Sequence, residues 1–396
     1  MSQQLSEKLW NSNYKKVWVA NFMLFFSFML LTPLLPLYLS ETFGAGKNTI
    51  GIVLSGYTLT ALLSRSLSGY LVDSFPRKVV LLTCYALFSL FFAGYFITGW
   101  SLMLFTVIRT LHGAPFGAAT VANSTVAIDV LHTSRRAEGI GYYGLSNNIA
   151  TAIGPSIGIY LYEATGDYDM IFLLSLLCSA VGLGVNSTLQ LKPREKVREK
   201  RKLSLDRFFL LKGWSEGLSL ACFSFSYGIL STYLAIYGKE QLGITGGTGL
   251  FFMLLSAGLI MSRLIGSRTL RQGKITQNAT LGTLISLIGY LLFAGLHNSI
   301  GYYGAALVIG LGNGHMFPAF QNMFVNLAPN SQRGTANSTL LTSWDVGIGI
   351  GILLGGSIVE AAGYNAVFWA AWMVNGIGVA FYLAYVRKNY LKNKLR

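Results

Sequence analysis

Three ionisable residues, Asp345, Arg109 and His315, stand inside apolar segments long enough to cross a membrane. An ionisable group inside a bilayer is costly, so each of the three is a candidate functional residue. Burial favours the neutral form of a carboxylate, which brings proton loading and release towards neutral pH. We therefore expect Asp345 to bind a proton or another cation. The alternative is a structural hydrogen bond to a neighbouring helix.

Arg109 and His315 each allow two interpretations. Arg109 either tunes a carboxylate or binds an anionic substrate, or it anchors one helix to the backbone carbonyls of another. His315 either relays protons or acts as a neutral hydrogen-bonding residue of the helix bundle. No second His or Cys lies at ligand spacing from His315, so no metal site is predicted. Arg65 and Arg263 are expected towards the cytoplasmic side, extending to the interface or pairing with loop acids.

Amide and aromatic side chains in the apolar segments are candidates for the lining of a substrate cavity, because amides in hydrocarbon need partners. The candidates are Asn21, Asn147, Asn148, Tyr227, Phe317, Gln321, Asn322 and Trp344. Such a mixed lining suits sugars and amphipathic drugs alike. A glycine-rich run at 310–314 follows no predicted strand, so it does not indicate a dinucleotide site, and no phosphate loop is present. We expect neither enzymatic activity nor a cofactor.

The composition places these residues in a membrane protein. The 396 residues are 53% hydrophobic and 11% charged, whereas a soluble chain carries about 25% charged residues. A membrane helix needs roughly 20 apolar residues. The apolar runs predict spans near 15–39, 48–71, 78–97, 101–126, 137–162, 168–190, 208–236, 247–268, 277–296, 300–326, 334–359 and 365–386. The fold class is therefore all-α polytopic, with residues 1–190 and 206–396 as two six-helix bundles and a basic cytoplasmic linker at 191–205.

The net charge of +15 reports orientation rather than binding to nucleic acid. With the N-terminus inside, only Lys47 and Lys239 of the 30 basic residues fall in outer loops. Basic residues gather on the cytoplasmic side of membrane proteins. We therefore expect a multi-pass protein of the cytoplasmic membrane, a monomer in the lipid bilayer, with both termini in the cytoplasm.

The two predicted bundles repeat each other in sequence. Leu-Ser-Arg65 recurs as Met-Ser-Arg263 at an offset of 198, and Gly154 and Gly158 recur as glycines at an offset of 197. Parallel repeats of this kind surround an axis along the membrane normal, with the substrate site between them near mid-depth. The repeat aligns Asn148 with Asp345, so the halves differ there in chemistry.

Three motifs resemble motifs of the major facilitator superfamily, and the resemblance to that family covers nearly the whole chain. The loop after the second span contains Gly69, Asp73, Arg77 and Lys78, with Ser74 and Pro76 departing from the usual basic residue and glycine. The fifth span carries Gly154, Pro155 and Gly158, which resemble an antiporter motif. Arg109, Gly113 and Gly117 resemble the arginine motif of the fourth span. The resemblance implies the fold of that family, a gating role for the loop, and proton-coupled efflux of a drug or metabolite, in the manner of arabinose-efflux or metallophore-export proteins.

We therefore predict a secondary active transporter that exports a small molecule, with protons as the coupling ion, by alternating access. Asp345 would carry the proton, Arg109 would tune it, and Gly154 with Pro155 would support a hinge. The alternatives are an uptake symporter or facilitator for a sugar or metabolite, and a membrane receptor or assembly partner that transports nothing.

Overall fold

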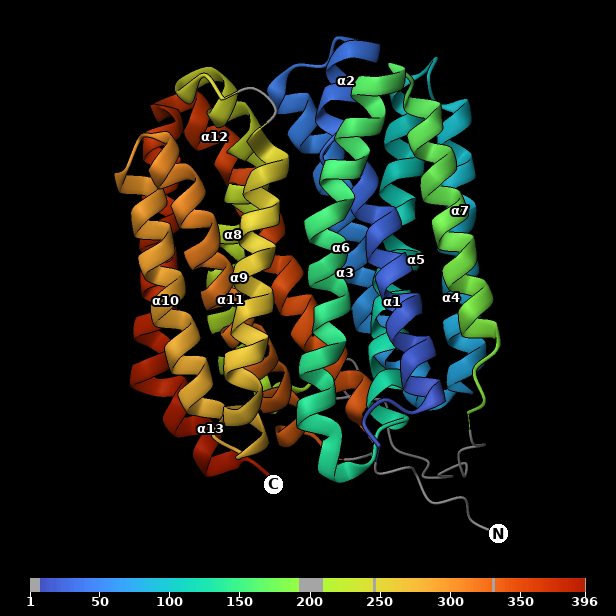
Figure 1. Cartoon of the computed structure of the whole chain (residues 1–396), viewed down its shortest axis with the longest axis vertical. Helices are drawn as coiled ribbons and strands as arrows, with labels where there is room; N and C mark the ends of the chain where they lie inside the picture. Colours follow the sequence, from blue (N-terminus) through green and yellow to red (C-terminus); the bar gives the residue numbers. More distant parts are fainter. Residues whose placement is uncertain (1–7, 192–208, 245–246, 330–331, 396) are drawn as a thin grey trace.

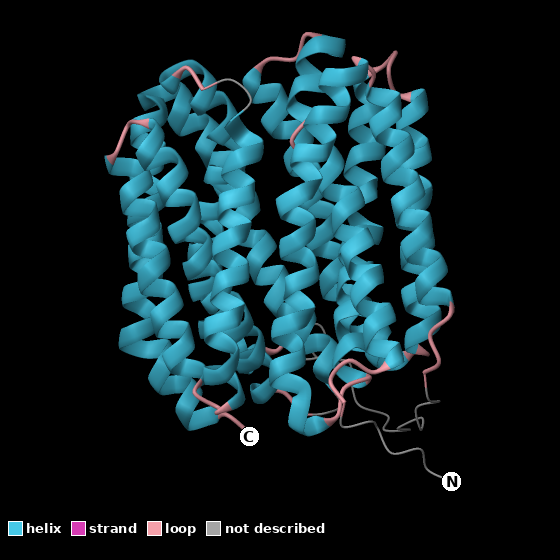
Figure 2. Cartoon of the chain, in the orientation of Figure 1, coloured by secondary structure: helices cyan, strands magenta, loops and turns pink. Residues whose placement is uncertain are grey.

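The computed structural model describes residues 8–191, 209–244, 247–329 and 332–395. Over these ranges helices dominate and no strand occurs (Figure 2). The predicted linker at 191–205 lies outside the described residues apart from its first position.

The first half of the chain forms a bundle of long helices. They are α1 (Ser12–Leu31), α2 (Leu35–Phe43), α3 (Lys47–Ser74), α4 (Arg77–Gly94) with the 3₁₀ turn η1 (Tyr95–Ile97), α5 (Leu102–Asp129), the 3₁₀ turn η2 (Thr133–Arg135), α6 (Arg136–Thr165) and α7 (Tyr168–Ser187). The first span is broken between α1 and α2. A proline at position 36, the second residue of α2, lacks the backbone N–H that would continue the helix from α1. The break separates α1 from α2 within what the sequence predicts as one span.

The second half forms a matching bundle. Its helices are η4 (Leu211–Gly213), α8 (Trp214–Leu242), α9 (Gly247–Arg271), α10 (Ile275–Gly295), α11 (Ser299–Leu327), α12 (Arg333–Phe381), the π-helical turn η6 (Tyr382–Val386) and α13 (Arg387–Asn393). Two spans meet within α12 at Gly363, whose φ of 81° lies in the left-handed region. Glycine reaches this conformation without the strain that a Cβ would add.

The described residues include eight helical stretches that are long and apolar enough to cross a membrane, by length and composition. The stretch Arg333–Asn393 holds the last two spans. α5, α6 and α11, of 28, 30 and 29 residues, lie packed among these helices and are long enough to cross as well. The helices thus correspond to the twelve spans that the sequence predicts.

The two bundles lie side by side, and both chain termini lie at the same end of the molecule (Figure 1). We call this the terminus-bearing end and the opposite one the far end. α3 packs against α12 and α6 packs against α9 across the boundary between the halves. Large apolar side chains such as Met103 and Ile300, about four-fifths exposed, cover the outside. A surface of this kind suits contact with lipid.

Candidate functional site

A buried ion pair joins the two halves. Arg65 of α3 binds the carboxylate of Asp345 of α12, and the two residues are only 4% and 7% exposed. Arg65 Nη1 also donates to the carbonyl of Leu341 at 3.1 Å, and Ser338 donates its hydroxyl to the carbonyl of Arg65. The Arg65 guanidinium lies 5.8 Å from the ring centre of Phe116. Asp345 stands 12 residues after Arg333, about 18 Å along the helix, which places the pair near mid-depth.

This geometry ties the charge of one side chain to the contact between the halves. Two opposite charges in a low-dielectric interior attract strongly, and removing one of them leaves the other buried without compensation. Protonation of Asp345 would therefore leave Arg65 as an unpaired buried cation. Loss of the charge on Asp345 would thus weaken the contact between α3 and α12.

The expectation that Arg65 extends to the interface is wrong, because the helix register turns its side chain towards α12. Arg109, expected to tune Asp345, lies instead within the first half. Its guanidinium is 4.0 Å from the ring centre of Tyr57 and donates to the Tyr95 hydroxyl at 3.3 Å. Tyr57 lies close enough to Arg65, Asp345 and Arg109 to interact electrostatically with all three. Arg109 thus contacts Tyr57, which lies within electrostatic range of the ion pair.

His315 is 3% exposed and hydrogen-bonded to a neighbouring helix. Its Nδ1 lies 2.8 Å from Oδ1 of Asn278, and Asn278 donates to the carbonyl of His315 at 2.9 Å. The pair of contacts fastens α10 to α11. This geometry favours the interpretation of His315 as a hydrogen-bonding residue of the bundle over that of a proton relay.

Three of the predicted cavity residues lie together in the second half. The ring of Trp344 on α12 is 5.8 Å from that of Tyr227 on α8 and 5.2 Å from that of Phe317 on α11. Trp344 stands next to Asp345 in the sequence. The three rings therefore form an aromatic cluster that includes the sequence neighbour of Asp345.

The predicted amides are distributed over several places. Asn21 is 1% exposed and binds Ser146 and Tyr143 inside the first half, at 2.8 and 2.6 Å. Gln321 donates to Asn337 at 3.3 Å, and Asn322 donates to the carbonyl of residue 318 in its own helix. The structure thus does not bring Asn21 into the aromatic cluster.

Asn147 and Asn148 on α6 differ from the other amides in their contacts. Oδ1 of Asn147 and Nδ2 of Asn148 are buried atoms without a hydrogen-bond partner. Asn148 is 8% exposed. These two side chains therefore have hydrogen-bonding capacity that the described protein groups do not use.

Asp73, in the loop motif, contacts the second half. Its carboxylate accepts hydrogen bonds from the backbone N–H of Gly334 and Thr335 at 3.3 and 3.1 Å, at the start of α12. A carboxylate is stabilised at a helix N-terminus by the unpaired N–H groups and the helix dipole. A Cβ on Gly69 would lie 2.7 Å from Cβ of Ser338, so glycine is needed for this close approach.

Basic side chains surround this contact at the terminus-bearing end. Arg77 binds Asp73 at 3.2 Å and also binds Asp129, which lies 3.8 Å from Arg333. The sequence interpretation missed Arg333, although a Ser-x-Arg pattern at 331–333 repeats one at 134–136. Lys78 of the same motif instead donates to the carbonyl of Leu189 at 2.7 Å, within the first half.

The glycines of the fifth span pack α6 against α1. A Cβ on Gly158 would lie 2.2 Å from the carbonyl oxygen of Leu30, and one on Gly154 would lie 2.7 Å from Cβ of Met29. α6 continues as a helix through Pro155, which is buried. In this structure the motif serves close packing within the first half.

Two bundles with a polar, ion-paired boundary define a polytopic transporter. The family model described as "Major Facilitator Superfamily" matches residues 17–345 and 279–395. The chain belongs to the Major Facilitator Superfamily. It is a membrane transporter and not an enzyme, and the predicted fold of two six-helix bundles is confirmed.

Two similar proteins cover most of the chain. The staphylopine export protein of Staphylococcus aureus is 21% identical over 373 residues, which span 91% of this chain and 93% of the relative. The uncharacterized transporter YhhS of Escherichia coli, described as of the same superfamily type, is 25% identical over 367 residues, 89% of this chain and 87% of the relative.

Two solved structures share the fold. The human organic anion transporter MFSD10 (TETRAN) matches with a TM-score of 0.78 at 16% identity, covering 93% of this chain and 98% of that one. FucP in its outward conformation matches with a TM-score of 0.74 at 14% identity, covering 96% and 99%.

Proposed function

We propose that this protein exports a small molecule in exchange for protons, by alternating access of its two halves. The observation that carries the proposal is the buried pair of Arg65 and Asp345, which links the halves through a side chain that can be protonated. The terminus-bearing end is taken as cytoplasmic, in the inner membrane of a bacterial cell, on the distribution of basic residues.

The charged form of Asp345 holds α3 against α12 and keeps the cytoplasmic side closed. A proton that reaches Asp345 from outside neutralises it and removes the attraction to Arg65. The halves then separate on the cytoplasmic side, where substrate enters. Substrate binding and release of the proton to the cytoplasm restore the pair and close that side. Each cycle thus moves protons into the cell and substrate out of it.

The relative named as a staphylopine export protein supports the outward direction of transport. The aromatic cluster of Tyr227, Phe317 and Trp344, in which Trp344 directly precedes Asp345 in the chain, supports a substrate with an apolar part. Within the proposal, Arg109 acts on the pair through Tyr57 rather than by direct contact.

The first experiment identifies a transported compound and its direction. Purified protein is screened by thermal unfolding against drugs, sugars and metal chelates, and stabilising compounds are measured inside cells with and without an uncoupler. Export driven by protons predicts that the uncoupler raises the internal concentration. A fall in the internal concentration would show uptake and reject the proposed direction.

The second experiment tests Asp345 directly. In proteoliposomes, the Asp345→Asn variant is expected to lose transport driven by a pH gradient, because an amide cannot carry a proton. Asp345→Glu is the matched control, since it keeps a titratable carboxylate and should keep part of the gradient-driven rate. If Asp345→Asn transports with a pH gradient at the wild-type rate, Asp345 is not the coupling residue.

A further inference from the structure

Arg263 of α9 is a buried cation that has no acidic partner among the described residues. The residue is 6% exposed, and its Nε and Nη1 have no hydrogen-bond partner. An arginine buried in this way costs several kcal/mol when nothing compensates its charge. Its position is therefore unfavourable unless a further group binds there.

The sequence repeat shows which compensation is missing. Arg65 and Arg263 occupy equivalent positions, and Arg65 is neutralised by Asp345. Arg65 also binds the carbonyl of Leu341, one helical turn before Asp345. The residue equivalent to Leu341 is Gly144, and a Cβ there would lie 2.9 Å from Nη2 of Arg263.

One turn after Gly144 on α6 stands Asn148, the equivalent of Asp345. Arg263 thus lies against α6 at the position that the repeat equates with the Arg65 contact on α12, and the residue equivalent to Asp345 is an amide. Nδ2 of Asn148 is itself a buried donor without a partner. The packed helices α9 and α6 thus each carry an unused donor group at the boundary between the halves, and one of the two is charged.

We propose that Arg263 and Asn148 bind the carboxylate of an anionic substrate. The bound carboxylate would neutralise Arg263 as the carboxylate of Asp345 neutralises Arg65. Arginine binds carboxylates through two parallel N–H donors, and the amide N–H₂ of Asn148 adds a third. This inference rests on the proposed transport function, and it names the substrate as a carboxylate anion.

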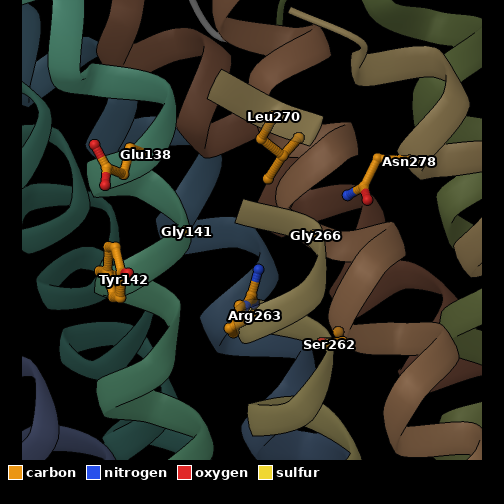
Figure 3. Close-up of a pocket in the computed structure, with 9 residues that line it drawn as sticks. Glu138, Gly141, Tyr142, Ser262, Arg263, Gly266, Leu270 and Asn278 are labelled. Carbon is orange, nitrogen blue, oxygen red and sulfur yellow. The ribbon is translucent and has the colours of Figure 1, made fainter. Parts of the chain in front are cut away.

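Arg263 lines a small crevice at the boundary between the halves. A crevice between α6 and α9 is lined on the α6 side by Glu138, Gly141 and Tyr142 (Figure 3). The facing residues include Ser262, Arg263 and Gly266 of α9 and Asn278 of α10. The glycines leave room where side chains would otherwise fill the boundary.

Two titratable groups flank the crevice. Glu138 turns its carboxylate away from Arg263 in Figure 3 and is ion-paired with Arg135 at 2.9 Å. His315 is held by Asn278 and also lies close enough to Arg263 to interact electrostatically. The carboxylate that lines the crevice is thus paired with Arg135, and no ion pair neutralises Arg263 among the described residues.

The test compares two probes of the same shape and different charge. Benzoate and benzamide are added at equal ionic strength to the purified full-length protein, and thermal unfolding is followed. Benzoate is expected to raise the unfolding temperature by about 2 °C or more where benzamide has no effect. The benzoate response is expected to be lost in Arg263→Gln. Equal responses to the two probes, or a benzoate response that persists in Arg263→Gln, would overturn the proposal.

A gain-of-pairing variant provides an independent readout. Asn148→Asp places a carboxylate where Asp345 stands in the other half, so it should pair with Arg263, raise the unfolding temperature and abolish the benzoate response. Asn147→Asp is the matched control, since it adds the same charge at the neighbouring position and should lower the unfolding temperature. A fall in Asn148→Asp equal to that in Asn147→Asp would overturn the proposal.

The outcome is separable from that of the transport mechanism. Benzoate binding is measured without a pH gradient and without transport. A benzoate response that depends on Arg263, in a protein whose Asp345→Asn variant transports normally, would retain the anion site and reject the coupling role of Asp345. The reverse result would retain coupling and reject the anion site.

Discussion

Asp345 and Arg65 carry opposite charges inside the protein, so each depends on the other. Breaking a buried pair by removing one partner costs about 3–5 kcal/mol, because it leaves an uncompensated charge, whereas removing both partners costs much less. Arg65→Gln alone is therefore expected to destabilise the protein strongly, and the double variant with Asp345→Asn is expected to recover most of the loss.

Thermal unfolding of the wild type, both single variants and the double variant completes a double-mutant cycle. A coupling energy near zero would show that the two side chains do not stabilise each other. Asn186→Ala, which removes a buried amide far along the chain from the pair, serves as a control whose effect should add independently.

At this scale the sequence identifies one member of the pair and misses its partner. Asp345 stands out because a carboxylate in a predicted span is rare and costly. Arg65 is predicted at the interface because span position alone does not give the direction of a side chain. The sequence repeat could have indicated that Arg65 faces Asp345. Two halves related by an axis along the membrane normal place the second span of the first half beside the eleventh span, in the second half.

Among the elements, α3 and α12 pack against each other across the boundary between the halves, and Gly69 lies within this contact. Since a Cβ at Gly69 would lie 2.7 Å from Cβ of Ser338, Gly69→Ala should push the two helices apart. Overpacking of this kind costs about 1–3 kcal/mol. The open form at the terminus-bearing end should therefore gain population by about tenfold.

Spin labels at two exposed positions on different halves, 134 between α5 and α6 and 272 between α9 and α10, report this opening as a longer distance. The labels are introduced after replacement of Cys84, Cys178 and Cys222. Gly184→Ala is the control, because a Cβ there meets nothing within 4 Å. An unchanged distance distribution in Gly69→Ala would show that this contact does not hold the end closed.

The observed helix boundaries agree with the predicted ones where the length of an apolar run decides them. They differ where backbone geometry decides them. Runs of apolar residues locate the spans, but the break between α1 and α2 depends on local proline geometry. The π-helical turn at Tyr382–Val386 leaves no pattern in hydrophobicity at all. The aromatic cluster likewise depends on how α8, α11 and α12 pack, which no single segment determines.

For the whole molecule, the distribution of basic residues predicts which side each end occupies. A cysteine at position 42, at the far end, should react with a membrane-impermeant maleimide in intact cells, because that end should face outward. A cysteine at position 272 should react only after the membrane is permeabilised. The opposite pattern of labelling would reverse the orientation and, with it, the direction of the proton cycle.

The two-half architecture is predictable because it repeats. Glycines at an offset of 197 and arginines at an offset of 198 mark the same places in both halves of the amino-acid sequence. What the repeat cannot give is which of the paired positions carries the chemistry. That depends on single differences, such as Asn148 against Asp345, whose effect is decided by the helix that packs beside each of them.

The connections at the far end are short. Residues 44–46, 98–101, 166–167 and 296–298 join successive helices there, and Gly363 alone joins the last two spans. An antibody fragment or a protease that approaches from this side meets only short loops among the described residues. Binders raised as markers for electron microscopy should therefore be selected against the opposite face of the molecule. An affinity tag inserted at Gly363 would lie in a one-residue connection that is too short to expose it.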